Sequence, residues 1–171
     1  MAIVGELPIL DPRAGSPLRC PSAQADMEDV QVLGIVQEHD GAKRVAYVDA
    51  PVPLSTDLVQ SCGEFVPHEV LRLSARCETA KCMHFDGTHC RLVERIVELM
   101  PKAVDTLPPC TIRDECRWFI QAGPPACLRC PQIVTVCEEP TPNLARIALG
   151  EVPAASPMMP GSNRRIGTAR G

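Results

Sequence analysis

Residues 110–135, CTIRDECRWFIQAGPPACLRCPQIVT, carry the strongest pattern in this chain. The stretch holds four cysteines, a C-x-x-C-P ending and the only tryptophan of the sequence. Clustered cysteines of this kind form disulfides, ligate zinc, or hold an iron–sulfur cluster through their thiolates. The fold and the function both depend on which of these three roles the cysteines have.

An earlier stretch has the same order of features. Residues 77–90, CETAKCMHFDGTHC, run C-x4-C, then His-Phe, then a glycine, then a third cysteine. Residues 110–127 run C-x5-C, then Trp-Phe, then a glycine, then a third cysteine. This shared order indicates a degenerate internal repeat of two half-sites, the second of which adds Cys130 and Pro131.

Composition and charge narrow the class of protein. The chain has 171 residues, a net charge of -4, ten cysteines and 3% aromatic residues. The length suits one domain, and so few aromatic rings make a thin core that an internal cross-link would help to hold. The acidic balance gives no reason to expect a nucleic-acid partner, which normally requires a basic stripe.

The N-terminal residues MAIVGELPILDPRAG have no basic start, and Glu6 and Pro8 interrupt their apolar run. No apolar segment of about 18 residues, the length needed to span a bilayer, occurs. We therefore expect a cytoplasmic protein without a membrane partner. In a reducing compartment clustered cysteines are more often metal ligands or redox thiols than disulfides.

The secondary-structure pattern predicts a small α+β domain. Residues 29–50 read as two strands joined by a turn at 39–41, which is a β-hairpin signal. Residues 57–60 fit a helical turn, and 67–75 fit either a strand or a helix. Within residues 91–103 the apolar side chains fall on one face, which predicts an amphipathic helix that ends at Pro101. These side chains are Leu92, Val93, Ile96, Val97 and Met100.

A further helix is predicted over 114–122, with Gly123 as its C-terminal stop. We expect an irregular N-terminal arm over 1–27 and a Pro-rich, basic tail over 138–171, with one short helix at 143–149. Between them, residues 28–137 form a single domain of a hairpin, two or three short helices and long loops around a cysteine-ligated metal site.

Seven cysteines are the predicted ligands. The most compact set of four is Cys110, Cys116, Cys127 and Cys130, and a mixed set from both half-sites is the competing arrangement. Two four-ligand sites would also use Cys77, Cys82 and Cys90, and they would need an eighth ligand. The candidates for it are Cys137, His84, His89 and Cys62. Cys20 and Cys62 stand alone in the sequence, where a free cysteine is usually a small buried hydrophobe.

Residues around the cysteines suit an anionic sulfur site. Gly87 and Gly123 let the chain reverse between ligands, and helices that begin after Cys90 and near Cys110 would aim N–H groups at the site. Rings that would shield it are Phe85, Trp118 and Phe119, although Trp118 is first of all a core residue. Arg113, Arg117 and Arg129 are either solvated surface residues or groups that neutralise a cluster.

The spacing favours iron–sulfur over zinc. A C-x-x-C-P ending occurs in cluster-binding ferredoxin runs, although those repeat C-x2-C more densely. Structural zinc sites use two C-x2-4-C pairs, and only Cys127 and Cys130 have that spacing here. The expected cofactor is one or two [4Fe–4S] clusters, with Zn2+ as the alternative.

The segments SARCETAKCMHFDGTHC and LPPCTIRDECRWFIQAGPPACLRCPQIVT resemble a family of small, uncharacterised bacterial cysteine-rich proteins. C-x-I-R-x-x-C-R-W-F, an Ala-Cys pair and C-x-x-C-P recur in that family, which is associated with nitrogen-fixation or specialised-metabolism gene neighbourhoods. The resemblance covers residues 75–135. It implies a cluster-binding role and supplies no activity.

No catalytic motif stands out in the sequence. We expect an iron–sulfur protein that transfers electrons to, or assists, a partner enzyme. The alternatives are a zinc-stabilised protein-interaction module and an enzyme in which a cluster with an open iron site acts as a Lewis acid. In each case removal of the metal should cost most of the order of the domain.

Overall fold

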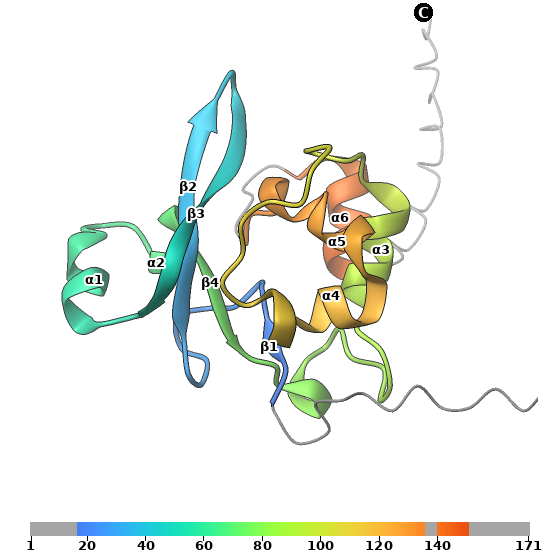
Figure 1. Cartoon of the computed structure of the whole chain (residues 1–171), viewed down its shortest axis with the longest axis horizontal. Helices are drawn as coiled ribbons and strands as arrows, with labels where there is room; N and C mark the ends of the chain where they lie inside the picture. Colours follow the sequence, from blue (N-terminus) through green and yellow to red (C-terminus); the bar gives the residue numbers. More distant parts are fainter. Residues whose placement is uncertain (1–16, 136–139, 151–171) are drawn as a thin grey trace, which may run out of the picture.

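The computed structural model describes residues 17–135 and 140–150. A four-stranded antiparallel sheet has the helices α3 to α6 gathered on one side and the short helices α1 and α2 on the other (Figure 1). The sheet order is β1-β4-β2-β3, and the predicted α+β class is confirmed. Its strands are β1 (Arg19–Cys20), β2 (Gln31–His39), β3 (Ala42–Pro53) and β4 (Leu71–Arg76).

The helical elements are mostly one or two turns long. They are α1 (Thr56–Ser61), α2 (Pro67–Val70), α3 (Arg91–Leu99), α4 (Arg117–Ala122), α5 (Pro124–Cys127) and α6 (Pro142–Leu149), with the 3-10 turns η1 (Thr79–Lys81), η2 (Arg113–Glu115) and η3 (Cys130–Gln132). None of the helices in the described parts of the chain combines the length and apolar character that crossing a membrane requires.

The predicted hairpin is present as β2 and β3. Asp40 and Gly41 form its turn with φ of 50° and 73°, the left-handed geometry that tight hairpin turns require. Against β4, Leu33 is an extra residue between the paired Val32 and Gly34, and against β3 the register shifts at the same place, where residues 48–51 have no partner on β2. At Gly34 the neighbouring strand is so close that an added Cβ would lie 2.5 Å from the Ala46 carbonyl oxygen.

Residues 67–75, expected to be either a strand or a helix, contain one of each, because α2 leads directly into β4. The amphipathic helix is α3, and its apolar face buries Val93 and Ile96 completely. The helix predicted over 114–122 begins later than expected. Residues 113–115 form the 3-10 turn η2, and α4 starts at Arg117 and ends at Gly123 with φ of 66°.

Two segments outside the expected core region belong to the packed domain. Residues 17–27 include strand β1 and the fully buried Ala23. Helix α6 buries Ile147 in the same cluster as Trp118 and Ile96, and Arg95 Nε donates to the Ile147 carbonyl at 2.7 Å. The main core therefore lies between α3, α4, α6 and the sheet.

Candidate metal centres

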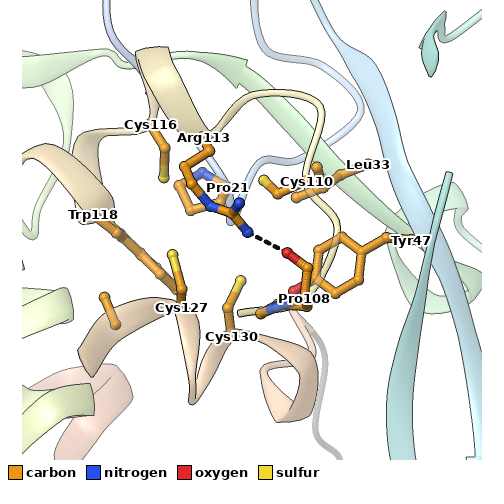
Figure 2. Close-up of a pocket in the computed structure, with 11 residues that line it drawn as sticks. Pro21, Leu33, Tyr47, Pro108, Cys110, Arg113, Cys116, Trp118, Cys127 and Cys130 are labelled. Atoms are coloured by element: carbon orange, nitrogen blue, oxygen red, sulfur yellow. Dashed lines mark hydrogen bonds between the residues drawn. The ribbon is translucent and has the colours of Figure 1, made fainter. Parts of the chain in front are cut away.

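Four cysteines from the second half-site surround one small cavity. We call Cys110, Cys116, Cys127 and Cys130 the C-terminal thiol group. Their sulfur atoms point into a shared space of about 20 Å3, bordered also by Tyr47 and Trp118 (Figure 2). The structure thus brings together the four cysteines that the sequence singled out as the most compact set.

Short turns place these cysteines. The turn η2 separates Cys110 from Cys116, and Cys116 both ends η2 and precedes α4. The positive φ of Gly123 reverses the chain into α5, whose last residue is Cys127. Cys130 then opens η3. Because each link is a single turn, four thiols from 21 residues of chain reach the same cavity.

Burial governs the protonation of these thiols. It raises the pKa of Cys110, Cys116 and Cys127, because removal from water disfavours the charged thiolate. Backbone N–H groups of Phe119 and Trp118 oppose the shift at Cys116, and the Arg113 side chain opposes it at Cys127. For Cys110, Cys116 and Cys127 the effect of burial on the pKa therefore exceeds that of the nearby N–H groups and of Arg113.

Two guanidinium groups adjoin the C-terminal thiol group. Arg113 points into the space between the sulfurs and donates to the Pro108 carbonyl (Figure 2). Arg72, only 1% exposed, donates to the carbonyls of Pro21 and Ile133. Its Nη2 lies 3.9 Å from Cys130 Sγ, and its Cζ lies 5.7 Å from the Trp118 ring centroid.

Two backbone carbonyls accept hydrogen bonds from the buried Arg72 side chain, but its charge has no carboxylate partner among the described residues. A buried guanidinium stays protonated and is stable only when a negative charge or a full set of acceptors surrounds it. Among the described residues no carboxylate pairs with Arg72, so the nearest potential anion is the thiol group itself.

Unpaired donors at the same cavity test whether an anionic sulfur centre fits there. Tyr47 Oη, Trp118 Nε1 and Arg113 Nε are buried and have no hydrogen-bond partner within the described parts of the chain. All three residues border the cavity. Buried donors without acceptors are costly, and a thiolate-ligated cluster with its own sulfides would supply the acceptors. The donor set therefore fits such a group.

A second group of thiols lines a different cavity. Cys20, Cys77, Cys82 and Cys90, which we call the N-terminal thiol group, all border a space of about 750 Å3. Burial raises the pKa of Cys20 to about 12, and the neighbouring Cys77 and Cys90 thiols contribute to that rise. Burial likewise raises the pKa of Cys90, and Cys82 and Cys77 add to it. The four thiols are thus electrostatic neighbours.

A tight turn and one side chain fix Cys90. Asp86 accepts from the N–H groups of Thr88 and His89, and Gly87 has φ of 102°, so the chain folds back and pairs Phe85 with Cys90. Gln121 of α4 accepts from the Cys90 N–H at 2.7 Å and donates to the Cys90 carbonyl at 3.1 Å. Cys90 also precedes α3, whose N–H groups favour its thiolate without forming a cap hydrogen bond.

The structure separates the candidates for an eighth ligand. His84 borders the N-terminal cavity, but its Nδ1 accepts from Arg95 Nη2 at 3.2 Å. Burial and Arg95 lower the pKa of His84, so the ring is neutral at pH 7 with its proton on Nε2. His89 is exposed. Cys62 ends α1, beyond the sheet from the helices (Figure 1), and Cys137 lies outside the described residues.

The residue that sequence reasoning missed is Cys20. It was expected to be an isolated hydrophobe, and it joins the N-terminal thiol group through strand β1. The signal that would have found it is the pairing of β1 with β4, which is a contact between distant segments. Each of these two cavities is lined by cysteines of one half-site, with Cys20 added at the N-terminal cavity, and the mixed set from both half-sites stays an untested alternative.

Within residues 17–135 and 140–150, no three or more His, Cys, Asp or Glu side chains are placed to hold a single metal ion. The two thiol groups are therefore defined by the cavities that they line. That they bind a metal remains a prediction. No protein-family model matches this chain, and neither characterised proteins nor solved structures give a match.

Proposed function

We propose that the C-terminal thiol group holds a [4Fe–4S] cluster and that the protein carries single electrons for a partner protein. The observation that carries this proposal is the concentration of positive charge and unpaired donors around four converging thiols. Arg72 is buried beside Cys130, and Arg113 projects among the sulfurs. A cluster held by four thiolates is anionic, so it would neutralise both guanidinium groups.

The donors favour a cluster over a zinc ion. Zinc held by four thiolates lies about 2.3 Å from each sulfur, which draws all four sulfurs close around one atom. Here the end of the Arg113 side chain lies between the thiols and leaves a cavity of about 20 Å3, so a cluster would take the place of that side chain (Figure 2). A cluster also has bridging sulfides that accept hydrogen bonds, which suits the unpaired Tyr47 hydroxyl and Trp118 indole.

The ligand set favours electron transfer over Lewis-acid chemistry. An open iron site would need one position without a cysteine, whereas four cysteines are available here. Cys116, Cys127 and Trp118 are buried, so they would keep water and substrates away from the group. When bound, a cluster of this type supplies reversible one-electron redox chemistry.

The residues of the chain would then have distinct tasks. The four cysteines bind the cluster and give up their protons to do so. Arg72 and Arg113 stabilise its negative charge, and charge of this sign raises a reduction potential. Trp118 excludes water from one side, while Tyr47 covers the side next to the sheet.

Cysteine variants of an anaerobically purified protein test this proposal. The double variant Cys116→Ala/Cys127→Ala should lose the iron, the acid-labile sulfide and the visible absorption of the C-terminal centre. Cys62→Ala is the matched control, because Cys62 donates only to the Leu58 carbonyl within α1. It should keep all three signals.

Two results would contradict the proposal. A colourless wild-type protein without iron or sulfide would reject it. Stoichiometric zinc that the double variant loses would assign the C-terminal thiol group to structural zinc, as in an interaction module.

A further inference from the structure

We propose that the N-terminal thiol group is a second [4Fe–4S] site, with Cys20 as its fourth ligand, and that the two centres exchange electrons past Trp118. This inference rests on the proposed function for the chemistry of the cluster. The site itself stands on different residues, in a different cavity.

The position of Cys20 follows from strand pairing. In the β1–β4 ladder Arg19 lies opposite Arg76 and Cys20 opposite Ala75, and the Cys77 N–H donates to the Leu18 carbonyl at 2.8 Å. Residues two apart on a strand share a face. Cys77 is therefore on the same face as Ala75 and diagonally across from Cys20, within the roughly 7–8 Å that separates such pairs.

The other two ligands reach this face through the loop between β4 and α3. The turn η1 follows Cys77 and ends at Cys82, just as η2 lies between Cys110 and Cys116. The folded-back segment at 84–91 then returns Cys90 to the same cavity. The two thiol groups thus use the same local device, a 3-10 turn between the first two cysteines of each half-site.

Cationic and donor groups border this cavity as well. Arg117 and Lys81 line it together with Asp26 and Glu78, and Arg117 Cζ lies 5.2 Å from the Phe85 ring centroid. Arg117 Nε is buried and has no hydrogen-bond partner in the described part of the chain. An anionic centre at the N-terminal thiol group would satisfy the two cationic groups.

The two cavities are neighbours. Trp118 borders both of them. Cys20, the last residue of β1, borders the N-terminal cavity, and Pro21, which follows the strand, borders the C-terminal cavity. The backbone of Arg19, in β1, forms an isolated parallel β-bridge with that of Cys116. A single strand and a single ring therefore separate the two proposed centres.

The difference in burial gives the pair a direction. All four cysteines of the N-terminal thiol group are half-buried and Met83 beside them is 77% exposed, whereas the C-terminal thiol group has two buried members, Cys116 and Cys127, and two half-buried ones. A one-electron carrier protein would therefore exchange its electron with the N-terminal centre. In the internal step one electron passes between the centres, so one cluster is oxidised and the other reduced, and no bond forms or breaks.

The test compares Cys20→Ala with Cys62→Ala in anaerobically purified full-length chain. Wild type and Cys62→Ala should hold about eight irons, as two four-iron clusters require. Cys20→Ala should hold about half, with the C-terminal centre intact. Cys82→Ala should also lose about half of the bound iron. Because Cys82 is half-buried in a loop outside β1, this second variant distinguishes loss of a ligand from misfolding of β1.

Electron paramagnetic resonance of the fully reduced protein provides the second readout. Two neighbouring paramagnetic centres should broaden each other's signals in wild type, and Cys20→Ala should leave one narrow signal. Equal iron in wild type and Cys20→Ala, or total loss of iron in both Cys20→Ala and Cys82→Ala, overturns the second site. Unbroadened wild-type signals overturn the coupling, and absence of iron from wild type rejects the proposed function itself.

Discussion

Replacement of Arg72 by methionine should lower the reduction potential of the C-terminal centre. The methionine keeps a long side chain in a buried position but removes the charge that lies 3.9 Å from Cys130 Sγ. At that distance, with an effective dielectric constant of about 20, two unit charges attract by about 4 kcal/mol. The electron added on reduction spreads over the cluster, so we expect it to lose roughly half of this attraction.

The lost attraction corresponds to a measurable potential. About 2 kcal/mol equals about 90 mV for one electron, so Arg72→Met should make the centre harder to reduce by roughly that amount. The variant also leaves the Pro21 and Ile133 carbonyls without their donor. We expect this loss to cost about 1–3 kcal/mol of folding stability, which a thermal melt will report separately.

The assay is a redox titration of the anaerobic protein followed by electron paramagnetic resonance. Arg72→Lys should lie close to wild type because it keeps the charge. Arg44→Met, on the exposed hairpin, is the control for a general change in net charge. An Arg72→Met protein that retains its cluster and titrates within about 20 mV of wild type would refute the electrostatic reasoning, since the shift expected from Coulomb attraction is several times larger.

Four further outcomes follow from the structure. Gly34→Ala should destabilise the domain by roughly 1–3 kcal/mol in a denaturant titration, because its Cβ would lie 2.5 Å from the Ala46 carbonyl oxygen. Gln121→Leu should speed the chelator-driven loss of iron from the N-terminal centre, because it releases both hydrogen bonds to the Cys90 backbone. The Cys20 pKa of about 12 is raised above the ordinary thiol value, so this ligand is protonated at neutral pH when no metal is bound. Cluster affinity should therefore rise with pH, and iron release should be faster at pH 6 than at pH 8. Removal of the metal under reducing conditions should abolish the cooperative thermal transition, and a chelated sample that still melts cooperatively would contradict this expectation.

Local patterns predicted much of the fold. The β-branched runs around 39–41 indicated the hairpin, and the apolar period of 91–100 indicated α3, because both signals lie within one element. The C-terminal thiol group was predictable for the same reason, since its cysteines are joined by single turns. The start of α4 was misplaced because η2 occupies residues 113–115 and Cys116 ends that turn.

Contacts between distant segments could not be read from the sequence. Cys20 enters the N-terminal thiol group only because β1 pairs with β4, more than fifty residues later. Arg72 looks like an ordinary strand residue, and its burial against Trp118 depends on how β4 packs on the helical side. Neither of these contacts follows from spacing or composition.

Native mass spectrometry of the anaerobically purified chain is the most direct test of the central claim. It weighs the intact protein with its bound groups, so it reports their identity and number in one measurement. The account predicts a mass above that of the polypeptide equal to two [4Fe–4S] clusters, about eight irons with matching sulfide. A mass equal to the polypeptide alone, or to the polypeptide with zinc, would contradict it.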